Sequence, residues 1–295
     1  MDTKFEDIVS EIKKAVDLHP ENIAVIEDGI STLTYCQMWE KASCVANGLI
    51  ERNRTSEYVT VILPKSSQYV IAILACWMAG KAFVPIGKDL PDTRKKYIED
   101  AVATDLTITE GDFEDFLKSR PVDCVETVTA STPAYIIFSS GTTGKPKGIL
   151  VGHSGLVNLA RCQRKAFRIK EKSRNLFFLS LNFDASISDI LVTITSGAAL
   201  VIETTESVEL SVNLLDVIEK RGITHADIPP SILRVINADN SPKCLETIVV
   251  GGEVTDSATV RNWADKVNLV NVYGPTEATI CTSLCQCSKD WTVPV

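Results

Sequence analysis

The stretch from residue 138 to residue 148, FSSGTTGKPKG, carries many groups that can bind an anion. Gly141, Gly144 and Gly148 permit backbone conformations that other residues avoid, so that amide N–H groups can turn toward one point. Hydroxyl donors and positive charges stand between these glycines: Ser139, Ser140, Thr142, Thr143, Lys145 and Lys147. The stretch follows the apolar AYII and precedes a helix that we expect to begin near His153. A donor-rich loop in this position suits a polyphosphate.

Two common phosphate-binding motifs do not fit this loop. The Walker A motif needs Ser or Thr directly after its Gly-Lys pair, whereas Pro146 follows Gly144 and Lys145 here. The loop does not follow the G-x-G-x-x-G pattern of dinucleotide-binding folds either. For a generic stretch of Gly, Ser and Thr, a solvated surface loop is the alternative interpretation.

The elements that would position the loop alternate between short apolar runs and helix-period stretches. This alternation indicates parallel sheets covered by helices, in which ligands bind at the carboxyl ends of the strands. Thr34 and Gln37 form a capping-box pair ahead of one helix, and Gly80 and Gly222 are placed to end two others. The region 110–132 has the weakest pattern and is expected to be rich in loops. The expected strands cover residues 58–63, 82–86, 134–139, 175–180, 198–202, 223–226, 247–250 and 268–272.

Length and composition place the chain among ordinary globular proteins. It has 295 residues, 45% of them apolar and 23% charged, enough for one large α/β domain or two packed subdomains. The net charge of −8 argues against a nucleic-acid-binding surface. The longest apolar run, residues 69–80, is too short to span a bilayer, and the charged N-terminal segment is unlike a signal peptide. We therefore expect a cytoplasmic protein with neither a nucleic acid nor a membrane as partner.

The nine cysteines agree with this placement. Most of them fall in apolar periodic segments, where a free Cys acts as a small buried hydrophobe. Cys281, Cys285 and Cys287 cluster near the C-terminal end of the sequence. No second cluster and no nearby His accompany them, so a zinc site is a disfavoured alternative.

The opening stretch, in its context AYIIFSSGTTGKPKGIL, resembles the signature loop of the adenylate-forming (AMP-binding) superfamily. This superfamily holds acyl-CoA synthetases, firefly luciferase and the adenylation domains of nonribosomal peptide synthetases. VVGGE at 249–253 stands where the family has a similar turn, and Gly87 replaces a usual Asp. The resemblance covers almost all of residues 1–295 and is greatest to the peptide-synthetase domains. Four further segments resemble family motifs in the same order: LTYCQMWEKA at 33–42, WMAGKAFVPIG at 77–87, NFDAS at 182–186 and NVYGPTEATIC at 271–281.

The resemblance implies an α/β fold, the large N-terminal domain of the adenylate-forming enzymes, with two parallel-type sheets covered by helices (αβαβα). It also implies a two-step reaction that uses ATP and Mg²⁺. A carboxylate attacks the α-phosphate of ATP to give an acyl-adenylate and pyrophosphate, and a thiol then takes the acyl group. In the peptide-synthetase branch this thiol is the phosphopantetheine arm of a carrier protein, and the substrate is an amino acid.

The resemblance also assigns residues to the nucleotide. The signature loop would hold the β- and γ-phosphates, Tyr273 would face the adenine ring, and Asn271 would offer its amide to the adenine edge. Thr276 would reach the α-phosphate, and Glu277 would ligate Mg²⁺, which prefers hard oxygen donors. Thr276 and Glu277 are the candidate catalytic residues. Further candidates on the nucleotide side are Gly252, Glu253 and Gly274.

Asp184 distinguishes between branches of the family. In amino-acid-activating relatives the aligned Asp pairs with the α-ammonium of the substrate, a need that fatty-acyl and aryl relatives lack. A charge-assisted pair of this kind contributes about 1.5–3 kcal/mol. The alternative for Asp184 is a plain helix N-cap. By alignment, the side-chain pocket would be lined by Asp184, Ala185, Ser188, Asp227, Val249, Gly251, Val272, Ile280 and Cys281.

Asp227 would add a second carboxylate to this pocket. An unpaired buried charge is costly, so Asp227 needs a partner from the substrate. A basic side chain, such as that of arginine, ornithine or lysine, would supply one, and a hydroxyl or amide donor is the weaker option. The alternative is that Asp227 caps a helix that opens at Pro229 and Pro230.

The family pattern predicts parts that would follow Val295. These are the remainder of the large domain, with an Asp for the ribose hydroxyls, a small C-terminal lid with a Lys for the transition state, and a carrier domain. We therefore interpret residues 1–295 as an incomplete adenylation domain, either a fragment or a truncated product, that is weakly active or inactive by itself. A non-catalytic nucleotide-binding remnant and an acyl-CoA synthetase-like ligase are the alternatives.

Overall fold

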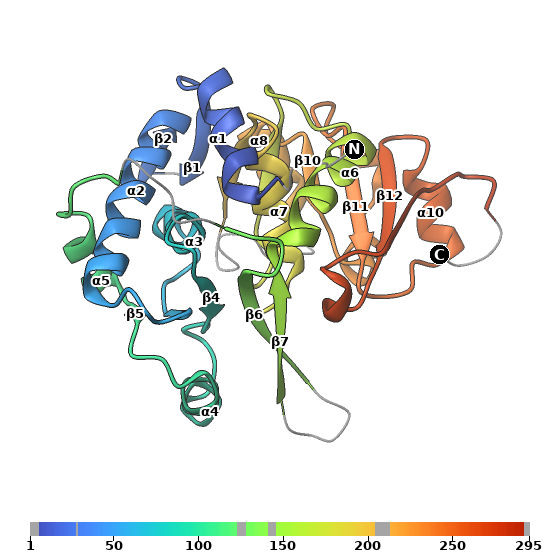
Figure 1. Ribbon diagram of the computed structural model, residues 1–295. Helices are drawn as coiled ribbons and strands as arrows, with labels where there is room; N and C mark the ends of the chain where they lie inside the picture. The colour runs from blue at the N-terminus through green and yellow to red at the C-terminus, as the bar shows by residue number, and fades with distance from the viewer. Residues whose placement is uncertain (1–5, 28, 123–127, 141–145, 204–212, 292–295) are drawn as a thin grey trace, which may run out of the picture.

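The computed structural model describes residues 6–27, 29–122, 128–140, 146–203 and 213–291, which form two sheets with helices between and around them (Figure 1). Within these residues the larger sheet is parallel except for its two edge pairs. Its strands lie in the order β13 (Ser283–Gln286), β12 (Asn268–Tyr273), β11 (Thr247–Gly251), β10 (His225–Asp227), β8 (Arg174–Phe177), β9 (Ala199–Ile202), β1 (Ile23–Glu27) and β2 (Ser31–Thr34).

The smaller sheet is parallel except for a hairpin at its edge. The hairpin strands pair from Pro133 with Gly152 to Ser140 with Pro146. Residues 141–145 of the signature stretch connect them and lie outside the described residues. The strands lie in the order β5 (Thr107–Ile108), β3 (Tyr58–Val61), β4 (Ala82–Pro85), β6 (Pro133–Ser140) and β7 (Pro146–Gly152).

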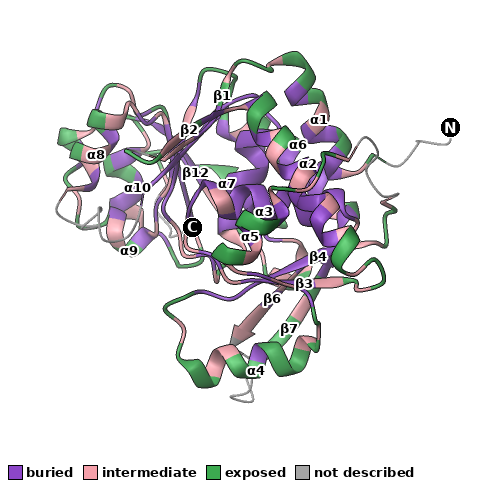
Figure 2. Cartoon of the chain, turned by 90° about the vertical axis from the view of Figure 1, so that its left-hand side faces the viewer, coloured by how far each residue is buried: buried purple, intermediate pink, exposed green. Residues whose placement is uncertain are grey.

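A layer of helices separates the two sheets. In α3, every residue except Gln68 is buried, because this helix contacts β1 of the larger sheet as well as β3 and β4 of the smaller one. An all-round apolar helix of this type has no solvent face. Figure 2 shows buried residues concentrated in this layer. Its helices are α1 (Ile8–Leu18), α2 (Tyr35–Arg52), α3 (Ser67–Met78), α6 (Leu156–Phe167) and α7 (Ala185–Ile194).

Outer helices cover the remaining faces of both sheets. Trp263, Leu233 and Ile218 come from three helices and share one apolar cluster with the larger sheet, and Ile98 packs with Val84 on the smaller sheet. The five layers confirm the predicted αβαβα arrangement. The outer helices are α4 (Asp92–Val102), α8 (Leu214–Arg221), α9 (Pro230–Leu233) and α10 (Ser257–Trp263), whereas α5 (Glu110–Phe116) packs beside α2. Three short 3₁₀ turns are η1 (His153–Gly155), η2 (Ala238–Asn240) and η3 (Thr276–Ala278).

The local signals in the sequence identified most of these elements. Every expected strand is present, with small shifts at the ends. Thr34 and Gln37 form both hydrogen bonds of the capping box that begins α2. Gly80 (φ 65°) and Gly222 (φ 61°) end α3 and α8 in the left-handed conformation that glycine adopts without strain.

The prediction of a loop-rich region at 110–132 is wrong at its start. Thr109 and Asp112 form a capping box, and α5 follows directly. The helix is short, so its apolar periodicity spans too few residues to be visible in the sequence. The helix expected near His153 begins with η1 and continues as α6.

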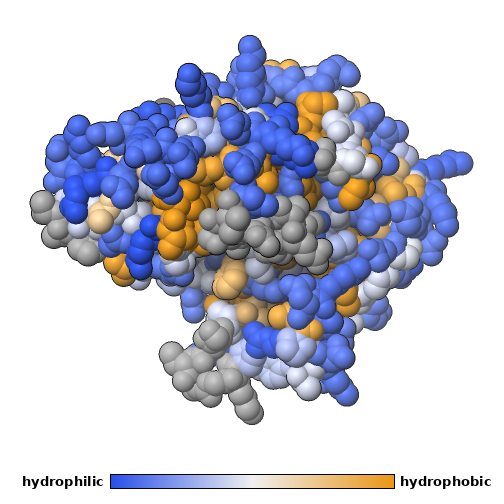
Figure 3. Space-filling view, turned by 180° about the vertical axis from the view of Figure 1, so that it is seen from behind, coloured by the Kyte–Doolittle hydropathy of each residue, from blue (hydrophilic) through white to orange (hydrophobic). Residues whose placement is uncertain are grey.

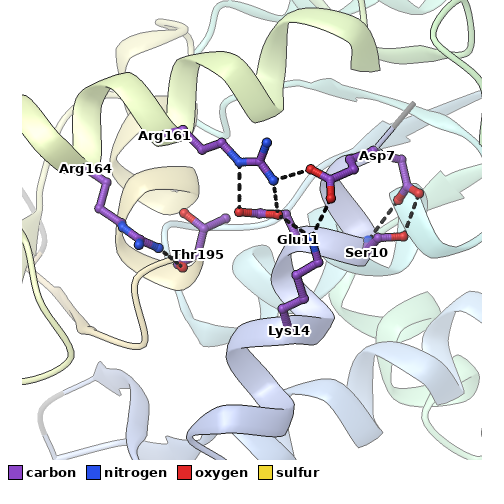
Figure 4. A network of polar contacts seen from close by, with 8 residues as sticks. Asp7, Ser10, Glu11, Lys14, Arg161, Arg164 and Thr195 are labelled. Carbon is purple, nitrogen blue, oxygen red and sulfur yellow. Dashed lines mark hydrogen bonds and ion pairs between the residues drawn. The ribbon is translucent and has the colours of Figure 1, made fainter. Parts of the chain in front are cut away.

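Salt bridges and hydrogen bonds connect α6 to its neighbours (Figure 4). Arg161 on α6 pairs with Glu11 on α1 at 2.9 Å, and Asp7 caps α1 one turn earlier. Arg164 on α6 donates to the carbonyl oxygen of Thr195, directly after α7, at 3.5 Å. The helix is therefore held on two sides by polar contacts.

In the part of the chain that the structure describes, no helix has the length and apolar character to cross a membrane. Seen from behind, the surface is mainly hydrophilic (Figure 3). Apolar side chains form several separate groups on this face.

Gly48 on α2 lies against the ring of Phe116 on α5. A Cβ atom at residue 48 would lie 2.9 Å from both Cβ and Cγ of Phe116, and closer still to its Cδ1. We expect Gly48→Ala to lower the free energy of unfolding by about 1–2 kcal/mol, because the overpacking outweighs the gain in helix propensity. Urea unfolding measures this loss.

The matched control is Gly111→Ala in α5. A Cβ there would meet nothing closer than Thr109 Oγ1 at 3.9 Å, so we expect unchanged or slightly higher stability. A Gly48→Ala protein as stable as the parent would contradict the close contact between α2 and α5.

Candidate active site

Three neighbouring strands hold the C-terminal end of α6. His225, Thr247 and Asn268 begin β10, β11 and β12 and lie side by side in register. The carbonyl oxygen of Phe167 lies 2.9 Å from His225 Nε2 and accepts a hydrogen bond from Thr247 Oγ1 at 2.8 Å. Asn268 Nδ2 donates to the carbonyl oxygen of Ala166 at 3.0 Å. These bonds satisfy the last carbonyls of the helix, which have no partner within it.

A cavity of about 320 Å³ opens between α6, α7 and the carboxyl ends of the same strands. Parallel sheets bind ligands at this edge. The structure brings all the residues predicted for the side-chain pocket to its wall: Asp184, Ala185, Ser188, Asp227, Val249, Gly251, Val272, Ile280 and Cys281. Three residues predicted for the nucleotide side also line it: Gly252, Glu253 and Gly274. The wall further includes five residues that the sequence did not identify: Gln163, Phe167, Leu179, Phe183 and Pro229.

Asp184 occupies the N-cap position of α7 but makes no capping hydrogen bond, contrary to the capping alternative. Its Oδ2 atom is buried and has no partner among the described residues. Burial raises the pKa of this carboxyl group, the Thr276 side chain lowers it, and the charge of Glu277 raises it. A buried acceptor oxygen at a cavity wall suits a ligand that brings a hydrogen-bond donor or a positive charge.

Asp227 ends β10 at the cavity wall. It does not cap α9, because that helix has Pro229 as its N-cap residue and no side-chain capping bond. Burial raises the pKa of Asp227 to about 7. Asp189 lies behind it on α7, and burial together with the charge of Asp227 raises the pKa of Asp189 strongly. The pair makes this end of the cavity polar and able to retain a proton.

Gly251 lines the cavity as predicted, and it also allows two strands to approach closely. A Cβ atom at this position would lie 2.6 Å from Val272 Cγ2 and 2.8 Å from the Val272 carbonyl oxygen. Glycine is therefore needed at the end of β11 for the close approach of β12.

The segment predicted to bind the nucleotide leaves the sheet beside this cavity. Tyr273 ends β12 with 70% of its side chain exposed. Asn271 Oδ1 is buried without a partner among the described residues. Thr276 and Glu277 form η3, which contacts β7, the strand that follows the signature stretch. The two predicted nucleotide motifs therefore belong to elements that contact one another.

The predicted phosphate-binding residues are only partly described. Ser139 and Ser140 end β6, and Lys147 is exposed on β7 opposite Ser139 in register. Five members of the predicted set lie outside the described residues: Gly141, Thr142, Thr143, Gly144 and Lys145.

Glu277 fits the predicted magnesium ligand. Its carboxylate is exposed and makes no hydrogen bond or ion pair with another described residue. Mg²⁺ is commonly held by one or two carboxylates together with phosphate oxygens of the substrate. The described residues contain no group of three or more His, Cys, Asp or Glu side chains that could hold a metal ion. A nucleotide would therefore supply the remaining ligands.

Gln163 is the polar wall residue that the sequence analysis missed. Its side chain is 1% exposed and lies on the buried stripe of α6 with Leu156, Leu159 and Phe167. An amide at an apolar position of a helix is a visible signal, because a buried polar group needs a partner. The family motifs do not include this position.

Comparisons with known proteins agree with this geometry. A family model described as AMP-binding enzyme matches residues 12–294. One of the linear gramicidin synthase proteins of Brevibacillus parabrevis is 34% identical over 293 residues, which cover 94% of this chain and 4% of that protein. Tyrocidine synthase 1 from the same organism is 29% identical, over 92% of this chain and 27% of its own length. This chain thus spans only a small part of these relatives.

Solved structures share the fold. NpsA-ThdA, an artificially fused adenylation-PCP di-domain NRPS from Klebsiella oxytoca, matches with a TM-score of 0.88 and 20% identity, over 100% of this chain and 63% of that chain. The N-terminal subdomain of Klebsiella oxytoca NpsA, in complex with 3-hydroxyanthranilyl-AMSN, matches with a TM-score of 0.84 and 21% identity, over 95% and 75% of the two chains. At these identities the likeness concerns the fold.

Asp227 makes the stability of the chain depend on pH. Its pKa is raised from 3.8 to about 7, so between these values the folded chain keeps a proton that the unfolded chain releases. The stability from this group is present in full below the lower value and is lost as the pH rises through about 7, by at most about 1.4 kcal/mol per pH unit. We expect Asp227→Asn to be more stable than the parent at about pH 8 and to lose this advantage toward about pH 4. Urea unfolding across this range measures the difference.

Asp239→Asn is the control, because Asp239 is exposed and its hydrogen bond to Lys266 lowers its pKa. We expect no gain at high pH from this variant. A difference between the parent and Asp227→Asn that stays constant with pH would contradict the raised pKa.

Proposed function

The chain belongs to the family of AMP-binding enzymes, and from this premise we propose that it activates an amino acid with ATP as an aminoacyl-adenylate. The observation that carries the proposal is the cavity wall. Asp184 lines this wall with an unpartnered buried oxygen, and the side chain of Thr276 and the charge of Glu277 act on the same carboxyl group. One position would thus hold the ammonium end of a substrate, and its neighbours would hold the nucleotide.

Asp184 would bind the α-ammonium group of the amino acid. Its carboxyl group has a raised pKa because it is buried, and a bound cation would restore the ionised form. The pair would contribute about 1.5–3 kcal/mol. A carboxylic acid without the ammonium group would leave the buried carboxyl unpaired. This requirement supports amino acids over fatty and aryl acids as substrates.

The substrate carboxylate would then face the α-phosphate near Thr276. Two anions repel one another, so this encounter needs donors and positive charge in place beforehand. Thr276 offers a hydroxyl, and Lys147 offers a charge from β7, which η3 contacts. Mg²⁺, held by Glu277 and phosphate oxygens, would supply further positive charge. The aromatic side chain of Tyr273 is exposed for contact with adenine.

The side chain of the substrate would extend into the cavity toward Asp227. Small and aliphatic groups line much of the wall, and Asp227 is the polar group at the end of β10. The substrate would need a group that satisfies this carboxyl, either a cation or a neutral hydrogen-bond donor.

The thiol that takes the activated acyl group would be the phosphopantetheine arm of a carrier protein. Similarity to linear gramicidin synthase and to tyrocidine synthase 1 supports this partner. A related fold occurs in the fused adenylation-PCP di-domain of Klebsiella oxytoca. The reaction would therefore load an amino acid for nonribosomal peptide synthesis.

The test of amino acid activation uses non-hydrolysable aminoacyl-sulfamoyladenosines. We expect the chain to bind such a probe, and to bind the matching probe that lacks the α-amino group at least about ten-fold more weakly. Asp184→Asn should remove this difference by weakening only the aminoacyl probe. Isothermal titration calorimetry measures both affinities.

Each opposite result would identify an alternative function. Stronger binding of the des-amino probe would indicate an acyl-CoA synthetase-like ligase. Binding of ATP without any acyl probe would indicate a nucleotide-binding remnant. Either result would contradict the amino acid proposal.

Glu277→Gln tests the magnesium ligand. In the parent chain we expect Mg²⁺ to strengthen ATP binding, and in the variant we expect most of this gain to be lost, because a neutral amide is a poor Mg²⁺ ligand. Stability without ATP should change little, since the Glu277 side chain is exposed and forms no hydrogen bond or ion pair with a described residue. Titration of ATP with and without Mg²⁺ measures the effect.

Glu246→Gln is the control for charge. Glu246 is also exposed. It directly precedes β11 at the amino end of this strand, whereas the cavity lies at the carboxyl end. We expect it to leave the Mg²⁺ effect intact. An equal Mg²⁺ effect in Glu277→Gln and the parent would count against the assigned ligand.

A further inference from the structure

Gln163 on α6 and Asp227 on β10 lie at the same level of the cavity. The reference point is the contact between the Phe167 carbonyl oxygen and His225 Nε2. Gln163 lies one helical turn before Phe167, and Asp227 lies two residues beyond His225 on the same face of the strand. Because α6 leads into β8 by a short connection, it runs antiparallel to β8 and β10. Both residues therefore lie about 6 Å from the Phe167–His225 contact, in the same direction along the strand.

The amide of Gln163 is held in one orientation. Ser188 Oγ on α7 donates to Gln163 Oε1 at 2.8 Å, and both residues are buried. The carbonyl oxygen of Gln163 faces the Ser188 hydroxyl in this hydrogen bond, so the NH₂ group points away from Ser188. No hydrogen bond joins Gln163 Nε2 to any described residue, and this atom is absent from the fully enclosed polar atoms without partners. The NH₂ group is therefore left for a ligand in the cavity.

We propose that Gln163, oriented by Ser188, is a specificity-determining residue that selects an amino acid with a carboxamide at the end of its side chain. The proposal rests on the proposed function and concerns the same cavity. A carboxamide has one acceptor and one donor group. Its carbonyl oxygen would accept from Gln163 Nε2, and its NH₂ group would donate to Asp227.

Other side chains would leave one of these two wall groups unpaired. A basic side chain has only donors, so the NH₂ group of Gln163 would face another donor. An aliphatic side chain would leave both wall groups without partners. An unpaired buried group reduces affinity by about ten-fold or more. The structure thus favours the amide option over the basic side chain that the sequence favoured.

The titratable groups around Asp227 are compatible with a neutral group at the end of the substrate side chain. Burial raises the pKa of both Asp227 and Asp189 and therefore disfavours their ionised forms. Lys65 attracts the charge of Asp189 and donates to the carbonyl of Phe178, and His225 is uncharged at neutral pH because burial lowers its pKa to about 4. The acid pair can keep a proton, so no cation is required from the substrate.

The experiment compares sulfamoyladenosine probes that carry glutamine, asparagine, ornithine, glutamate or norleucine, titrated into the 295-residue chain. We expect one of the two carboxamide probes to bind about ten-fold or more tightly than the other three. Gln163→Glu replaces the donor by an acceptor. It should weaken the carboxamide probe about ten-fold and improve the ornithine probe relative to it. Ser188→Ala frees the amide to rotate and should reduce the preference.

Two controls separate specificity from folding. Gln286→Glu makes the same change at an exposed position on β13 and should leave the order of the probes unchanged. Gln163→Met keeps the volume and removes the donor, so it should weaken the carboxamide probes and spare norleucine. A purely structural role of Gln163 would instead weaken all probes equally, and this result would overturn the proposal.

The outcomes also separate this proposal from the function on which it rests. If no aminoacyl probe binds, amino acid activation is wrong and this proposal with it. If probes bind but ornithine, glutamate or norleucine is preferred, only the carboxamide assignment is wrong. If the order of the probes is unchanged in Gln163→Glu, Gln163 does not determine specificity.

Discussion

The attachment of α6 to the first residues of three parallel strands is the constraint on which the site depends. Thr224 Oγ1 lies 2.6 Å from His225 Nδ1, and with the hydroxyl as donor the ring proton stands on Nε2, which donates to Phe167. Burial lowers the pKa of His225 to about 4, so this arrangement persists at neutral pH. Thr247 binds the same carbonyl oxygen. Because the C-terminal end of α6 is fixed on the strands, the side chains between the helix and the sheet set the width of the cavity. This cavity opens toward the N-terminal end of α6.

The atoms around this cavity are organised for a ligand rather than for stability alone. Asp184 Oδ2 at the cavity wall is buried without a partner among the described residues, as are Asp189 Oδ2 on α7 and Asn271 Oδ1 on β12. Each such group costs about 1–3 kcal/mol when it stays unpaired. The apolar layer formed by α2, α3 and the inner sheet faces offsets this cost.

The sequence predicted the positions of eight strands, the N-terminal capping box of α2 and the residues that meet at the cavity, because these features depend on local pattern or on family motifs. It did not predict β1, β2, β5, β7 and β13, which are short or lie at sheet edges and carry weak patterns. It also missed Gln163, since the position of this residue opposite Asp227 is fixed by contacts between Phe167 and strands far away in the sequence. Asp184 and Asp227 both have ordinary capping interpretations in the sequence. Only the packed structure shows that neither side chain makes a capping bond.

The turn after η3 connects the proposed nucleotide side to the proposed substrate side. Thr279 and Ile280 have φ values of 60° and 69°, which are strained for β-branched residues. The strain is maintained by close packing, since a Cβ at Gly274 would lie 2.6 Å from Cys281 Cα and one at Gly155 would lie 2.7 Å from Thr279 Oγ1. Relaxing the turn would move Ile280 and Cys281, which line the cavity, together with η3, which carries Thr276 and Glu277. A change in the shape of the cavity therefore also shifts Thr276 and Glu277, the residues that we propose face the phosphates, so that fit at one end would be coupled to alignment at the other.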